Sequence, residues 1–207
     1  MVTGKEILSL LIALVVMAFS NSFLDVDVFL YSLLFFAIIL LVYVAAKKFM
    51  SYYFESETEE RIWSFQIYGF APSQYFKKPV PIGIIFPFIL SIISLGYIKW
   101  FALTETEIKP TVARAARRHD FYSYSELTEW HVGLIPAFGI ICVLIVSFIA
   151  YLVNVPELAR LAIYFSFFNM LPIGKLDGGK IFFGSLILYF TLLVVVLIAL
   201  GYALLLV

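Results

Sequence analysis

The sequence predicts an all-α integral membrane protein with about six transmembrane or re-entrant helices and a small membrane-associated β segment. The chain has 207 residues, of which 63% are hydrophobic and 14% are charged. Its mean hydropathy is +1.03. Soluble domains are nearer half apolar and a quarter charged, and a chain of this size could not bury so much apolar surface in water. We therefore expect a multi-pass protein of the cell membrane whose main partner is the lipid bilayer.

Long apolar runs predict the positions of the membrane helices. A membrane span needs about 20 mostly apolar residues, and the segments that satisfy or approach this are 6–22, 28–50, 132–153, 158–173 and 181–207. The first could instead be a signal peptide, but the run is long and no small-residue cleavage pattern follows it. A sixth segment, 80–98, is short and interrupted by Pro87 and Gly96. It either crosses the bilayer or enters and returns against protein.

Two polar stretches separate these segments. In 51–79, aromatic and polar residues roughly alternate, which is typical of strands. The stretch 99–131 contains Arg114, Arg117 and Arg118, interpreted as a solvated face beside anionic headgroups. The acidic loop 23–27 is expected outside the cell, and both basic stretches in the cytoplasm. Both can be cytoplasmic only if 80–98 is re-entrant. The absence of a repeat predicts a single domain, 1–207.

Charge and cysteine content exclude some function classes. The formal net charge is zero, so no overall field attracts nucleic acid, and none is expected as a partner. Cys142 is the only cysteine and lies in an apolar run. A lone thiol there is expected to behave as a small hydrophobic side chain.

The segment 168–180, with the sequence FNMLPIGKLDGGK, is the most informative motif. Ionisable groups at membrane depth are costly and commonly functional. Pro172, Gly174 and Gly178 must interrupt a helix, and the freed backbone groups are tolerated only inside protein or beside a water-filled cavity. The motif is therefore either a broken helix that carries Asp177 into a polar pocket or a simple interfacial loop with Asp177 in water.

A family resemblance favours the first interpretation. The run Asn169-x-x-Pro172-x-x-x-Leu176-Asp177-Gly178-Gly179 resembles the Asn-Pro…Leu-Asp-Gly signature of the site-2 proteases, which are intramembrane zinc metalloproteases. The resemblance covers about 40–180 and is specific only at 168–180. It implies that Asp177 occupies the position of the third zinc ligand. It also implies a groove for a partner strand, formed by Asn169, Pro172, Leu176, Asp177, Gly178 and Gly179.

The catalytic half of the family signature is missing. The family carries His-Glu-x-x-His on an earlier helix, where two histidines hold zinc and the glutamate is the general base. No such motif occurs in this chain. Aligned on the small residues of the second helix, Tyr43 and Lys47 stand at the histidine positions and Val44 at the glutamate. The chain thus looks like a pseudoprotease in which no catalytic residue is intact, and neither a metal nor any other cofactor is expected.

The same positions predict what could replace zinc. Tyr43 and Lys47 share one helix face, and the family fold would bring that face to Asp177. We therefore predict an ion pair between Lys47 and Asp177, with a hydrogen bond from Tyr43. The alternative is that Lys47, like Lys48, marks the cytoplasmic end of the helix and reaches the headgroups; for Lys48 this is the expectation. The histidines His119 and His131 are expected to be polar loop or interface residues.

The expected function is capture of a transmembrane or extended segment of a partner membrane protein, without cleavage. Segment 60–70 would add the partner segment by edge pairing. One alternative is an active protease in which Lys47 is the base for a hydroxyl nucleophile, and it requires a serine or threonine within hydrogen-bond reach of Lys47. A second alternative is a small transporter or channel component, since broken helices and midplane charges also occur there.

Overall fold

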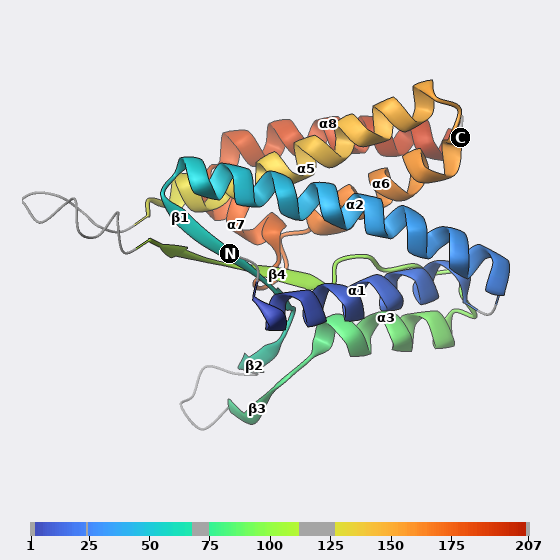
Figure 1. Ribbon diagram of the computed structural model, residues 1–207, viewed down its shortest axis with the longest axis horizontal. Coiled ribbons are helices and arrows are strands. Elements are labelled where there is room, and N and C mark those ends of the chain that lie inside the picture. Colours follow the sequence, from blue (N-terminus) through green and yellow to red (C-terminus); the bar gives the residue numbers. More distant parts are fainter. Residues whose placement is uncertain (1–2, 24, 68–74, 112–126, 206–207) are drawn as a thin grey trace, which may run out of the picture.

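The computed structural model describes residues 3–23, 25–67, 75–111 and 127–205 (Figure 1). Among these residues, four helices are long and apolar enough to cross a membrane, which indicates a membrane protein. They are α1 (Gly4–Ser22), α2 (Val26–Tyr53), α5 (Glu129–Leu152) and α8 (Leu186–Leu205). The shorter helices are α3 (Ile82–Ile93), α6 (Pro156–Asn169) and α7 (Asp177–Gly184).

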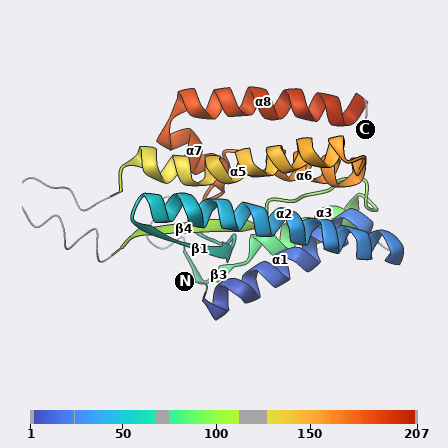
Figure 2. The same ribbon diagram turned by 45° about the horizontal axis from the view of Figure 1, so that its top comes forward.

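The long helices lie side by side in layers. Figure 2 shows α8, α5, α2 and α1 stacked in that order, with α6 beside α5. Helix α7 packs so closely on α5 that a Cβ at Gly184 would lie 2.9 Å from the Cα of Gly133. The core between α2, α5 and α6 contains the fully buried Tyr43, Ile140 and Phe165. The Tyr43 and Phe165 rings meet edge to face, with centroids 4.9 Å apart.

The predicted apolar segments are confirmed as long helices in three cases and corrected in the others. The segments 6–22, 28–50 and 132–153 correspond to α1, α2 and α5. Segment 158–173 was predicted too long, because α6 has only 14 residues and ends at Asn169. Segment 181–207 is not continuous, since Ser185 has an extended backbone (φ −165°, ψ 116°) that separates α7 from α8.

The segment 80–98 enters the bundle and returns. Helix α3 has 12 residues, or about 18 Å at 1.5 Å per residue, which is too short to cross a bilayer alone. After it the chain runs back beside α1, where the Trp100 N–H donates to Ser20 Oγ at 3.3 Å. A Cβ at Gly83 would lie 2.3 Å from the Leu103 carbonyl oxygen. The chain that follows the segment therefore comes back to the start of α3 at Leu103.

The predicted strand segment is also present, and a further strand lies outside it. The strands are β1 (Ser56–Ile62), β2 (Phe65–Ile67), β3 (Tyr75–Val80) and β4 (Thr104–Pro110). They form two antiparallel pairs, β1 with β4 and β2 with β3. Strand β4 belongs to the polar stretch 99–131, for which no strand was predicted. The arginines of that stretch and His119 lie outside the described residues.

The register of the β1–β4 pair decides which backbone groups face outward. Hydrogen bonds from Trp63 N–H to the Leu103 carbonyl (2.8 Å) and from Thr111 N–H to the Glu55 carbonyl (3.1 Å) fix the hydrogen-bonded positions. In an antiparallel pair, these alternate with positions whose N–H and C=O point away from the partner strand. In β1 the outward groups belong to the even-numbered residues 56–62, and in β4 to the even-numbered residues 104–110.

Candidate functional site

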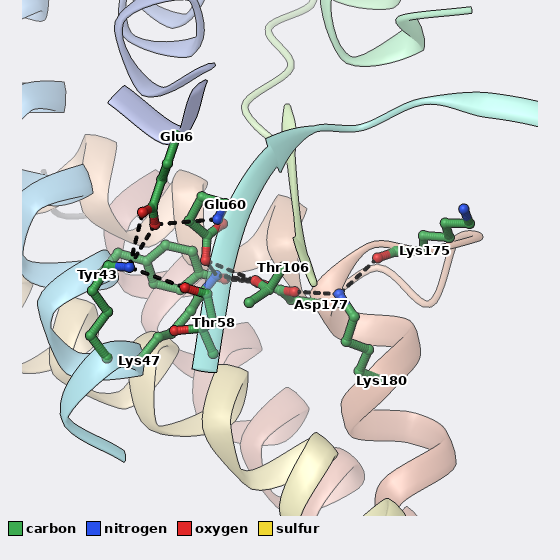
Figure 3. Close-up of polar contacts among 10 residues, drawn as sticks. Glu6, Tyr43, Lys47, Thr58, Glu60, Thr106, Lys175, Asp177 and Lys180 are labelled. Carbon is green, nitrogen blue, oxygen red and sulfur yellow. Dashed lines mark hydrogen bonds and ion pairs between the residues drawn. The ribbon is translucent and has the colours of Figure 1, made fainter. Parts of the chain in front are cut away.

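A cluster of buried polar side chains lies where α2, the β1–β4 pair and α7 meet (Figure 3). Each of its members is at most 2% exposed. The cluster consists of Tyr43 and Lys47 on α2, Glu60 on β1, Thr106 on β4 and Asp177 on α7. Tyr43 and Lys47 are one helical turn apart and therefore share a face. Glu60 and Thr106 are directly opposite each other in the strand pair.

The Lys47 ammonium group is the centre of this cluster. Its Nζ lies 2.5 Å from Asp177 Oδ2 and 3.0 Å from Glu60 Oε1. It also lies 2.7 Å from Thr106 Oγ1 and 3.7 Å from the centroid of the Tyr43 ring. Three oxygens and a π face thus surround a cation that has no access to water. The predicted Lys47–Asp177 ion pair is confirmed.

Asp177 has partners on both oxygens. Oδ2 accepts a hydrogen bond from the Tyr43 hydroxyl at 2.6 Å, as predicted, and contacts Thr106 Oγ1 at 3.0 Å. Oδ1 pairs with Lys180 Nζ at 3.0 Å. Lys180 also donates to the Lys175 carbonyl at 3.0 Å, which ties the preceding loop to α7. Lys47 and the partly exposed Lys180 together balance the two carboxylates Asp177 and Glu60, so the cluster is neutral once Lys180 is counted with it, as a buried set of charges requires.

Two glycines make room for the cluster. A Cβ at Gly139 of α5 would lie 2.8 Å from a Tyr43 ring carbon and 3.0 Å from Lys47 Cγ. A Cβ at Gly178 would lie 2.3 Å from the Met170 carbonyl oxygen and 2.6 Å from that of Leu171. The first glycine lets α5 approach the polar face of α2. The second lets α7 start directly against the end of α6, which fixes Asp177 in the cluster.

A second polar cluster closes the outer edge of β1. Glu6 of α1 is buried and pairs with Lys48 Nζ at 2.8 Å. Glu6 also accepts from the outward N–H of Glu60 at 3.3 Å, and Lys48 donates to the outward carbonyl of Thr58 at 3.1 Å. The expectation that Lys48 reaches the headgroups is therefore wrong. Within the expected partner-binding segment 60–70, the outward N–H of Glu60 is thus already bonded to Glu6.

No described residue pairs with the outer edge of β4. Among the described residues, none forms a hydrogen bond with the outward N–H or C=O groups of Thr106 and Ile108. This edge borders a cavity of about 550 Å³, which we call the β4–α7 groove. Its other walls are the start of α5, with Leu127 and Val132, and α7 with its preceding loop, including Lys175, Lys180 and Phe183. The groove is lined by both apolar and charged side chains.

The predicted groove residues are only partly in this groove. Gly179 lines it. Leu176, Asp177 and Gly178 are buried next to it. Pro172 is exposed and lies outside the groove lining.

Asn169 is 1% exposed and donates to the Phe165 carbonyl of its own helix at 2.9 Å. It also lies outside the groove lining. Its role here is to satisfy the end of α6, which the resemblance did not imply.

The residues present do not fit a catalytic zinc ion. Zinc ligands in proteins are thiolates, imidazoles and carboxylates, whereas the α2 side chains beside Asp177 are a phenol at Tyr43 and an ammonium group at Lys47. Val44 is half-buried and has no polar atom to act as a base. Within the described part of the chain, no group of three or more His, Cys, Asp or Glu side chains is arranged to hold a metal.

The lone thiol of Cys142 and the described histidine lie elsewhere. Cys142 is a half-buried free thiol on α5. His131 is at the start of α5, where its ring contacts the Phe54 ring with centroids 4.6 Å apart.

Sequence reasoning missed Glu6, Glu60 and Thr106. Glu60 and Thr106 alternate with exposed polar residues in strands whose two faces are both polar, so no hydrophobic alternation marks the buried face. Glu6 resembles an ordinary acidic residue in the first turn of a helix. The one available signal was charge balance. The buried Lys47 and the half-buried Lys48 together require two carboxylates as partners.

Comparisons with protein-family models, curated proteins and solved structures found no match to this chain. The class of protein is therefore defined by the structure itself, as a membrane protein with a neutral buried ion-pair cluster beside an open strand edge.

Proposed function

We propose that this chain is a multi-pass membrane protein that captures an extended segment of a partner membrane protein in the β4–α7 groove and does not cleave it. The observation that carries the proposal is the outer edge of β4 at the groove, with which no described residue pairs, next to a β1 edge where Glu6 and Lys48 bind the N–H of Glu60 and the carbonyl of Thr58. An unpaired strand edge binds extended peptides through main-chain hydrogen bonds, and pockets beside it select side chains. The resemblance of 168–180 to the site-2 proteases supports the same role.

The buried cluster supports the absence of proteolysis. Lys47 Nζ contacts Asp177, the only carboxylate that matches a zinc-ligand position of the family. A cation attached to the helix thus satisfies this carboxylate without metal. The cluster would then hold α2, the strand pair and α7 in the arrangement that keeps the groove formed.

A second candidate is a hydrolase with an amine base, and one contact favours it. Thr106 Oγ1 is within hydrogen-bond reach of Lys47 Nζ, at 2.7 Å, which is the geometry of a nucleophile and its base. Two carboxylates beside Lys47 oppose this role, because they stabilise the ammonium form, and an ammonium group cannot accept a proton. The main-chain edge therefore carries the proposal, and Thr106 is assigned to the ion-pair cluster.

Replacing Ile108 by proline is expected to weaken peptide binding. Proline removes the outward N–H of position 108, while the β1–β4 hydrogen bonds stay intact because this residue is not at a hydrogen-bonded position. The probe is a fluorescent peptide of about ten alternating valine and threonine residues, and its affinity for the detergent-solubilised protein is measured by anisotropy. We expect about a tenfold loss, from one hydrogen bond and the ring's bulk at the edge.

Ile108→Thr is the matched control, because it changes the side chain and keeps the N–H. It should bind the peptide nearly as well as the unaltered protein. Equal affinity of the proline and threonine variants would overturn edge pairing at β4.

The purified protein is expected to contain no stoichiometric zinc and to leave the bound peptide intact. Elemental mass spectrometry measures the zinc, with Asp177→Ala as the control, and chromatography follows the peptide. About one zinc per chain, lost in Asp177→Ala, would contradict the ion-pair interpretation. Cleavage that disappears in Thr106→Val would instead establish the hydrolase.

A further inference from the structure

The face of the β1–β4 pair that points away from the buried cluster is acidic. The odd-numbered residues of both strands lie on this face, because side chains alternate along a strand. They comprise four carboxylates and two cationic side chains, namely Glu57, Glu59, Arg61, Glu105, Glu107 and Lys109. Arg61 pairs with Glu59 and Glu107, each at 2.6 Å, and Lys109 pairs with Glu107 at 2.9 Å. Both cations are thereby used.

Glu105 is left without an ion pair in this arrangement. Arg61 is its direct cross-strand neighbour, yet the guanidinium group turns to Glu59 and Glu107 instead. Glu105 is half-buried and lines the β4–α7 groove. Its Oε2 atom is buried, and no described residue forms a hydrogen bond with it. This buried oxygen therefore needs a hydrogen-bond donor, and none of the described residues supplies one.

Among the described residues, most cations that line the groove already have a carboxylate partner, Arg61 with Glu59 and Glu107 among them. Lys180 is held by Asp177, and Lys175 is exposed on the loop before α7. The exposed Glu129 adds another carboxylate on the α5 side of the groove. Within the described part of the groove, Lys175 is thus the cation left for Glu105 and Glu129, neither of which forms an ion pair with a described residue.

We propose that the partner segment is basic and places a lysine or arginine side chain against Glu105 when its backbone pairs with β4. This inference rests on the proposed function, since it assigns the partner chemistry of the same groove. A strand added at the outer edge of β4 would put one side chain beside Glu105 on the same face, about 5 Å away. Apolar side chains of the added partner segment would lie near Leu127, Val132 and Phe183, which line the groove.

The test compares two forms of the alternating peptide, one with a central lysine and one with a central glutamine. The lysine peptide is expected to bind the unaltered protein about three- to fivefold more tightly, which is the upper range for an opposite-charge cross-strand pair. Glu105→Gln should abolish this preference and leave the affinity for the glutamine peptide unchanged. Glu105→Lys should reverse it in favour of a peptide with a central glutamate.

Glu57→Gln is the matched control, because it removes a carboxylate from the same face at a position that does not line the groove. It should retain the preference for lysine. If both peptides bind equally well and are sensitive to Ile108→Pro, the basic-partner inference fails and edge pairing stands. If neither peptide binds, the proposed function itself fails.

The pH dependence gives a second readout. Burial raises the pKa of Glu105 above its ordinary value, and Lys175, Lys180 and Arg61 partly oppose this shift. The preference for lysine requires the carboxylate form, so it should decline as the pH falls through this raised pKa. The decline should begin at a higher pH than for an ordinary glutamate, and it should be absent in Glu105→Gln.

Discussion

Replacing Lys47 by alanine is expected to lower the free energy of unfolding by about 3–5 kcal/mol, because removal of one partner leaves buried, uncompensated charge. Asp177 would lose its 2.5 Å ion pair and Glu60 its 3.0 Å ion pair. Lys180 would remain on one side of Asp177, but nothing in the cluster would replace the cation beside Glu60. Denaturation in mixed micelles, monitored by circular dichroism or by proteolysis of the unfolded state, measures the change.

Lys109→Ala is the control for loss of a lysine. Its ammonium group pairs with Glu107 on the exposed face of the sheet, where an ion pair contributes about 0–1 kcal/mol. Methylammonium provides a further check, because it should fit the space left in Lys47→Ala and restore part of the lost stability. Equal stability of the two lysine variants would contradict the central role of Lys47, and so would an absence of rescue in an otherwise folded protein.

The ion pair itself could be predicted from the sequence, and its surroundings could not. Tyr43 and Lys47 are one turn apart, and the motif at 168–180 marked Asp177, so two local patterns and one family resemblance were sufficient. Glu60 and Thr106 reach the same ammonium group from strands that are far from α2 in sequence. Their position depends on the register of β1 with β4, and a strand with two polar faces carries no signal for its register.

Prediction of where the helices begin and end was limited in a similar way. Hydropathy measures how apolar a run is, but not whether its backbone is continuous. The run 181–207 is apolar throughout, and yet Ser185 separates α7 from α8. The run 80–98 resembled a short span. In the structure the chain returns after it, so that Leu103 packs closely against Gly83. Both differences come from contacts with other parts of the chain, which composition does not record.

Under the proposed function, the Lys47 cluster and the Glu6–Lys48 pair both serve to keep the outer edge of β4 available for a partner segment. Glu6 and Lys48 prevent pairing at β1, as edge strands are commonly protected by charged side chains. The Lys47 cluster attaches the opposite side of the strand pair to α2 and α7. A two-stranded ribbon is marginally stable alone, so its usable edge depends on these side-chain attachments. Variants that disturb the cluster should therefore weaken peptide binding in proportion to the loss of folded protein.

Replacing Gly178 by alanine is expected to disrupt the protein more than any other single methyl addition described above. The new Cβ would lie 2.3 Å from the Met170 carbonyl oxygen, 2.4 Å from its carbonyl carbon and 2.6 Å from the Leu171 carbonyl oxygen. All three are backbone atoms, so no flexible side chain can move aside. Overpacking costs about 1–3 kcal/mol where neighbours relax, and a rigid backbone contact places this variant at or above the upper value, about 3 kcal/mol.

Gly201→Ala should have the opposite effect and serves as the control for Gly178→Ala. No atom lies within 4 Å of a Cβ at Gly201, which is in the C-terminal part of α8, and alanine is favoured over glycine in a helix by about 1 kcal/mol. The two variants therefore receive the same methyl group with opposite expected signs. Thermal unfolding in detergent should separate their midpoints on either side of the unaltered protein. If Gly178→Ala were as stable as Gly201→Ala, α7 could not start against the end of α6 as described. The placement of Asp177 beside Lys47 would then lose its structural basis, because that contact holds the first residue of α7 in the cluster.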